Sequence, residues 1–134
     1  ELDGRHCWCG RSGCLETFLS ESGFEDDYER ITGERHDAAS IAAAAATGDI
    51  VADSVVQVFE DRLGRATATI ISLFDPQMII LGGMVPLPER LETRVPRKWP
   101  GCVQINRTKT RLAVSANGAD ALLKGAALLM SGKD

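Results

Sequence analysis

The longest hydrophobic pattern in the chain lies between residues 50 and 74. Apolar side chains recur there at intervals of three and four positions, the spacing of one helix face; they are Val55, Phe59, Leu63, Ala66, Ile70 and Leu73. Asp49 is placed to cap the first turn. Asp75 ends the pattern, because a residue before proline is disfavoured in the helical conformation. The pattern therefore predicts one long helix over residues 50–74.

Shorter helices are predicted before and after this long helix from apolar spacing, alanine content and glycine stop signals. They cover residues 15–19, 24–31, 38–47, 87–95 and 119–130. In the closing helix, we expect a face made of Leu122, Ala126 and Leu129 to lie against a sheet. Residues 101–109 are predicted to be irregular.

Two short apolar runs predict β-strands. Residues 78–81 have no polar face, which is typical of a strand buried on both sides, and residues 112–114 form the second strand. The order of helices and strands predicts an α/β fold with parallel pairing of these strands. A two-stranded sheet is marginal alone, so we expect either further strands outside this sequence or another molecule along the open edge. Self-association as a homodimer or larger assembly is the corresponding prediction.

Composition narrows the class of protein. The chain has 134 residues, 44% of them hydrophobic, which is enough for one folded core. The formal net charge of -4 argues against direct nucleic-acid binding, which normally needs a basic surface. No apolar run approaches the roughly 20 residues of a membrane span, and the first residues do not resemble a signal peptide. We therefore expect a cytoplasmic protein without a membrane partner.

The cysteines indicate a metal site. Cys7, Cys9 and Cys14 lie within eight residues, together with Gly10 and Gly13, and two cysteines separated by one residue rarely form a disulfide. As thiolates they suit a structural Zn²⁺ ion, and the glycines allow a tight turn. We therefore predict a zinc knuckle over residues 7–16; the alternative is a surface loop with three reduced thiols.

Trp8 in the knuckle and the distant Cys102 have simpler interpretations. Trp8 is expected to cover the metal site, and Cys102 to be a buried or partly buried thiol. A knuckle with three cysteines normally needs a fourth ligand, which we expect before Glu1. Water, His6 or a neighbouring molecule are the other possible ligands. With no initiator methionine, the chain is interpreted as the C-terminal part of a longer protein.

The knuckle motif resembles one known family. The run Cys7-x-Cys9-Gly10-x-x-Gly13-Cys14-x-Glu16-Thr17 is similar to the signature of the ROK family, which comprises sugar kinases and sugar-responsive repressors with an actin-like ATPase (ribonuclease H-like) fold. The segment from Ser22-Gly23-Phe24 through Asp27-Tyr28 to Arg30 and Gly33 resembles the bacterial fructokinase branch. The resemblance implies that residues 1–134 are the C-terminal part of a ROK kinase domain.

The resemblance also implies an activity and site residues. The activity is phosphate transfer from ATP, with Mg²⁺, to a hexose, namely fructose at its 6-hydroxyl. Cys7, Cys9 and Cys14 resemble the structural zinc ligands, and Glu16 resembles the carboxylate that binds sugar hydroxyls. Gly82 and Gly83 resemble the pair that leaves room for the nucleotide. By sequence alone, Glu16 is also explained as a solvated carboxylate at a helix start, and the glycine pair as a tight turn.

Some family features lie outside this sequence. The catalytic aspartate, phosphate loop and zinc-binding histidine of the family belong before Glu1, so we expect no catalytic base here and no activity in the isolated chain. Leu122 and Glu21 stand where the family often has glycine. Two further hypotheses remain open: the sugar-sensing half of a ROK repressor, and an inactive proteolytic core.

Overall fold

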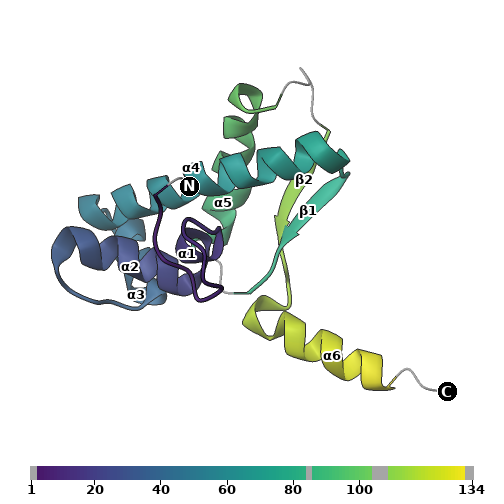
Figure 1. Ribbon diagram of the computed structural model, residues 1–134, viewed down its shortest axis with the longest axis horizontal. Helices are drawn as coiled ribbons and strands as arrows, with labels where there is room; N and C mark the ends of the chain where they lie inside the picture. Colours follow the sequence, from purple (N-terminus) through teal and green to yellow (C-terminus); the bar gives the residue numbers. More distant parts are fainter. Residues whose placement is uncertain (1–2, 84–85, 104–108, 132–134) are drawn as a thin grey trace.

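The computed structural model describes residues 3–83, 86–103 and 109–131 (Figure 1). Its elements are α1 (Glu16–Leu19), α2 (Glu21–Thr32), α3 (Ala38–Ala46), α4 (Ile50–Phe74), β1 (Met78–Leu81), α5 (Pro88–Arg94), the 3₁₀-helix η1 (Val95–Gly101), β2 (Arg111–Val114), the 3₁₀ turn η2 (Gly118–Asp120) and α6 (Ala121–Ser131). Each helix and strand predicted from the sequence is present. The α/β class, rich in helix with a small parallel sheet, is therefore confirmed.

Helix α4 is the centre of the fold, with α2 and α3 packed towards one end and the sheet at the other (Figure 1). The 3₁₀-helix η1 packs along its middle, where Lys98 meets Asp61 and Trp99 meets Thr67. The side chain of Asp49 caps it by accepting a hydrogen bond from the backbone N–H of Ala52 at 2.8 Å. Its buried face includes Phe59, which meets Phe24 of α2 edge-on with ring centroids 5.5 Å apart. The apolar pattern of residues 50–74 therefore predicted the helix correctly, and the first half of its stripe lies in the core. In the last turns the prediction was wrong, because Ile70 and Leu73 are 41% and 70% exposed while Ile71 is buried.

Two elements differ from the prediction at their ends. Helix α2 begins before residue 24, because the hydroxyl of Ser20 accepts a hydrogen bond from the backbone N–H of Gly23 at 3.1 Å and caps the helix there. Residues 95–101 form η1, a 3₁₀-helix that was not predicted because this stretch contains two prolines. Trp99 stabilises η1 by burying its ring and donating from its indole N–H to Thr67 of α4 at 2.9 Å. Most of the predicted irregular segment, residues 104–108, lies outside the described residues.

The two strands pair in parallel, as predicted, with Met78 opposite Arg111 and Leu81 opposite Val114. Burial of β1 on both faces was wrong, because Ile80 is 63% exposed. In the described part of the chain nothing covers that face, so its apolar side chains lie at the surface. Self-association through this edge stays a prediction.

The closing helix does not pack as predicted. Helix α6 runs away from the sheet (Figure 1), and Leu129, expected to face the sheet, is 83% exposed. Ala126 is exposed as well. The apolar spacing identified the helix correctly but not its partner, because periodicity defines a face without defining what the face contacts.

Among the described residues, no single helix is both long and apolar enough to cross a bilayer. Helices α3 and α4 reach that length and composition only as a pair, and the pair is bent by 110° at its break.

The contact between α1 and α2 depends on one glycine. A Cβ atom placed on Gly23 would lie 2.7 Å from the Cα atom of Phe18 and 2.8 Å from the carbonyl carbon of Thr17. Both are backbone atoms, so no side-chain rotation relieves the clash. Gly23 therefore lets α2 approach the short helix that begins at Glu16.

We predict that Gly23→Ala lowers the free energy of unfolding by about 1–3 kcal/mol, because overpacked sites must shift their backbone. Gly125→Ala is the matched control, because it is also a helical glycine but has nothing within 4 Å of the added Cβ. It should be neutral or stabilise by up to about 1 kcal/mol, the usual gain for alanine in a helix. Urea unfolding followed by circular dichroism measures both. Equal effects of the two variants would contradict the close contact.

Candidate functional site

The loop that carries Cys7, Cys9 and Cys14, here named the cysteine loop, is closed by backbone hydrogen bonds. The N–H of Cys7 donates to the carbonyl of Arg11 at 2.7 Å, and the N–H of Gly13 donates to the carbonyl of Arg5 at 2.9 Å. Gly10 and Gly13 have φ angles of 84° and 72°, in the left-handed region that favours glycine. The glycines predicted to allow a tight turn therefore do so.

This loop brings three sulfur atoms together. The Sγ atoms of Cys7, Cys9 and Cys14 all lie within 4.8 Å of one another, and those of Cys9 and Cys14 are 3.5 Å apart. Tetrahedral zinc with bonds of about 2.3 Å needs sulfur atoms about 3.8 Å apart, so the three thiols fit such an ion with small adjustments. One coordination position would remain for another ligand.

The thiols of this loop differ in acidity. A hydrogen bond from the backbone of Arg11 lowers the pKa of Cys9, helped by hydrogen bonds from the other two thiols. The hydrogen bond to Cys9 raises the pKa of Cys14 to about 11. Of these two thiols, the exposed Cys9 therefore loses its proton more readily in the metal-free loop, while Cys14 keeps its proton.

The predictions for Trp8 and for the distant Cys102 were both wrong. Trp8 is 89% exposed, so its side chain does not cover the site. The turn from Cys7 to Cys9 points this intervening side chain to solvent while Cys7 is buried. Cys102 is exposed rather than buried, because it follows the last turn of η1 at the surface.

Glu16 lies directly beside the cysteine loop. It is exposed and begins α1, and both the backbone N–H and the hydroxyl of Thr17 donate to the carbonyl of Cys14, at 3.0 and 2.8 Å. A pocket of about 210 Å³ lies here, lined by Arg5, His6, Cys7, Trp8, Glu16, Thr17, Ser22 and Asp26. The structure therefore places the predicted sugar-binding carboxylate in one pocket with the cysteine loop.

Sequence reasoning missed the charged network behind this pocket. Arg5 donates to the carbonyls of Thr17 and Gly23, at 2.9 and 3.1 Å, and also to the carboxylate of Asp27. Arg62 of α4 donates to the other oxygen of Asp27, and its guanidinium carbon lies 5.0 Å from the ring centroid of Phe18. An acidic segment such as residues 25–27 is normally a solvated stretch of helix, but the side chain of Asp27 is only 14% exposed. Arg5 and Arg62 lie 22 and 35 residues away from Asp27 in the sequence, so no local pattern predicts these pairs.

The glycine pair lies at a different place. Gly82 follows β1, Gly83 has a φ of 81°, and a Cβ on either would meet no atom of the described residues within 4 Å. Helix α5 follows this turn and is tied to α4 by Arg90, which donates to Glu60 and Asp53. The hydrogen bond from Arg90 lowers the pKa of Asp53. Neither glycine lines the pocket that contains Glu16.

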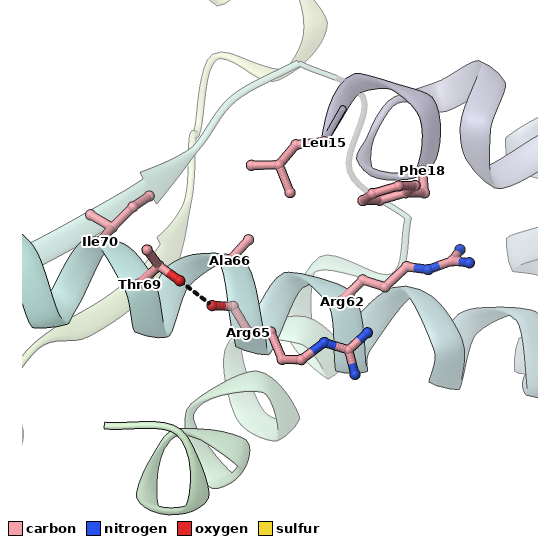
Figure 2. Close-up of a pocket in the computed structure, with 7 residues that line it drawn as sticks. All are labelled: Leu15, Phe18, Arg62, Arg65, Ala66, Thr69 and Ile70. Atoms are coloured by element: carbon pink, nitrogen blue, oxygen red, sulfur yellow. Dashed lines mark hydrogen bonds between the residues drawn. The ribbon is translucent and has the colours of Figure 1, made fainter. Parts of the chain in front are cut away.

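A second pocket, of about 290 Å³, lies between α1 and α4 (Figure 2). Leu15 and Phe18 form one side, and side chains of α4, including Ala66 and Ile70, form the other. The guanidinium groups of Arg62 and Arg65 lie at one end, and no carboxylate lines it. It is therefore less suited to polar sugar hydroxyls than the pocket of Glu16.

The fold is thus a helix-rich α/β fold in which a three-thiol loop lies beside a carboxylate, and similarity to known proteins identifies its family. The family model described as "ROK family" matches residues 1–133. An N-acetyl-D-glucosamine kinase of Pectobacterium carotovorum is 32% identical over 123 residues, covering 92% of this chain and 40% of that protein. The chain therefore belongs to the ROK family.

Solved structures agree with this assignment. A ROK glucokinase from Streptomyces griseus, in complex with glucose and AMPPNP, matches with a TM-score of 0.80 and 26% identity over 96% of this chain and 48% of that one. A ROK transcriptional regulator, a homolog of the E. coli MLC protein, has a TM-score of 0.73 and 29% identity over 85% and 32% of the two chains. The chain thus spans less than half the length of these relatives. The N-acetyl-D-glucosamine kinases among them do not support the specific resemblance to fructokinases.

We predict that iodoacetamide at pH 8 modifies Cys9 of the metal-free chain roughly tenfold faster than Cys14, because only the thiolate is nucleophilic. At that pH the lowered pKa of Cys9 gives it the larger thiolate fraction, whereas Cys14, with a pKa of about 11, remains protonated. Tryptic cleavage at Arg11 separates Cys9 from Cys14, and fragmentation in the mass spectrometer distinguishes Cys9 from Cys7 in the same peptide. The difference should disappear in denaturant, and faster modification of Cys14 in the folded chain would refute it.

Proposed function

We propose that this protein takes part in ATP-dependent phosphorylation of a hexose, with Glu16 accepting hydrogen bonds from sugar hydroxyls. The main support for the proposal is the position of Glu16, which lines a polar pocket next to the cysteine loop. An ionised carboxylate offers two acceptor oxygens, which suits adjacent hydroxyl groups. His6 and Ser22 line the same pocket and supply further polar groups.

In this proposal the cysteine loop is a zinc knuckle with a structural role. Cys7, Cys9 and Cys14 would hold the ion, and Thr17 transmits the position of Cys14 to α1 through its two hydrogen bonds. The knuckle therefore determines where Glu16 begins its helix. Zinc supplies rigidity here rather than chemistry.

Gly82 and Gly83 are proposed to face the nucleotide, ATP with Mg²⁺. The open space beside both glycines supports this, because a ligand could lie against bare backbone there. The similar glucokinase of known structure was solved with AMPPNP, which makes a nucleotide the natural ligand to test. A cytoplasmic location, where ATP and reduced thiols are available, fits the same proposal.

Two sugars are the leading candidates. Fructose, phosphorylated at its 6-hydroxyl, follows from the segment around Ser22 to Gly33 that resembles fructokinases. N-acetyl-D-glucosamine follows from the names of several relatives. The second candidate function is sugar sensing in a repressor, which is favoured by the structural similarity to a ROK transcriptional regulator.

The test is kinetic and uses the complete natural protein. We expect ATP-dependent phosphorylation of a hexose, measured by coupled ADP release with fructose, glucose and N-acetyl-D-glucosamine in turn. Glu16→Gln should raise the KM for the sugar about 10- to 100-fold, since hydrogen bonds to a charged acceptor are the strong ones, and leave the KM for ATP unchanged. Glu34→Gln is the control, because that carboxylate is 78% exposed and pairs with His36 away from the pocket.

Each result separates the candidates. Sugar binding by calorimetry without ATP turnover would favour the sensor, and no binding of any of the three sugars would refute both functions. Unchanged sugar kinetics in Glu16→Gln would refute only the proposed role of Glu16 and would leave the proposed activity standing.

A separate prediction concerns the metal. The chain purified without chelators should carry one zinc ion, and Cys9→Ser should lose it on desalting because two thiolates hold zinc poorly. Cys102→Ser is the matched control, since Cys102 is also exposed but lies outside the loop. Elemental analysis of the three proteins measures the content. A protein without zinc would leave the cysteine loop without the proposed role.

A further inference from the structure

Arg5 is the side chain that joins the cysteine loop to the helices behind it. Its backbone carbonyl accepts the hydrogen bond from Gly13 that closes the loop. Its guanidinium donates to the carbonyl of Thr17, the residue after Glu16, and to the carbonyl of Gly23 in α2. One residue therefore contacts the loop, α1 and α2 at once.

The guanidinium of Arg5 is itself held in place. Asp27 of α2 accepts hydrogen bonds from Arg5 on one carboxylate oxygen and from Arg62 of α4 on the other. The three side chains are only 14–19% exposed. Charge-assisted hydrogen bonds shielded from water are stronger than those on the surface, so Asp27 restricts the orientation of Arg5.

The surrounding packing leaves little freedom for α1. Gly23 brings α2 against the backbone of Thr17 and Phe18, and Phe18 is 3% exposed under Arg62. Helix α1 has four residues and no side-chain cap at its start. A helix this short has little intrinsic stability, so its position depends on such outside contacts.

From these contacts we propose that Arg5 is a positioning residue for Glu16, anchored by Asp27. The inference rests on the proposed sugar-binding role of Glu16. It adds Arg5 to the knuckle as a second structure that holds Glu16 in position. Thr17 carries both supports, because its N–H and hydroxyl bond to Cys14 while its carbonyl accepts from Arg5. The backbone on both sides of the Thr17 Cα atom is therefore fixed, and with it the position of the preceding Glu16.

The first experiment tests the anchor without any activity. In the zinc-loaded chain, Asp27→Asn should speed amide hydrogen exchange in residues 16–19 roughly tenfold, since it removes the charge that holds Arg5. Asp61→Asn is the matched control. Asp61 is also a carboxylate that pairs with a cation, Lys98, but it lies away from α1. Exchange in α3 should not change in either variant.

The second experiment tests positioning in the complete natural protein. Asp27→Asn should raise the KM for the hexose about tenfold with the KM for ATP unchanged. In the double variant with Glu16→Gln, the two effects should not add, because residues acting on one contact are coupled. A merely structural role of Asp27 would give additive effects on the KM for the hexose.

Arg5→Lys provides a second variant if Asp27→Asn does not fold. Lysine keeps the charge but lacks the forked donors that reach two carbonyls and a carboxylate, so it should reproduce the faster exchange and the raised KM. Unchanged exchange in residues 16–19, or additive kinetics, would overturn the inference. If no hexose is phosphorylated while exchange in α1 still rises, the proposed function fails and the anchoring of α1 by Arg5 stands.

Discussion

The carboxylate of Asp27, placed between two arginines, is the interaction on which the candidate site depends. Arg5 belongs to the cysteine loop and Arg62 to the central helix α4, so this one acid connects the surface site to the core. Removing one member of a largely buried charged group leaves the others unpaired, which costs more than the loss of a surface pair. The site is therefore coupled to the packing of α4 rather than built on the loop alone.

Helix α4 also holds the elements around it in place. It packs against α2, which carries Asp27, and it binds α5 through Arg90 and η1 through Trp99. The glycine pair between β1 and α5 is thus held relative to the same helix as the site of Glu16. A rigid helix of 25 residues is a suitable frame for the two proposed ligand sites, whose separation it would keep fixed.

Local signals predicted the elements well. The apolar stripe and Asp49 located α4, and the glycines in the cysteine loop located its turns, because such signals act over a few residues. Burial was predicted less well. Ile80 lies in an apolar strand and Leu129 in an apolar helix face, yet both are exposed in this chain. A sequence pattern shows that a face is apolar, but what covers the face depends on segments distant in sequence or on another molecule.

The sequence by itself determined the family motif, the three thiols and the carboxylate that follows them, because their spacing of a few residues confines them to one small loop. Only the tertiary structure decided that Asp27 would meet Arg5 and Arg62. Those contacts join residues 22 and 35 positions apart, and many acid–arginine pairings satisfy the same composition. The choice among them is made when α2 packs on α4, since packing brings one particular set of charges within hydrogen-bond distance.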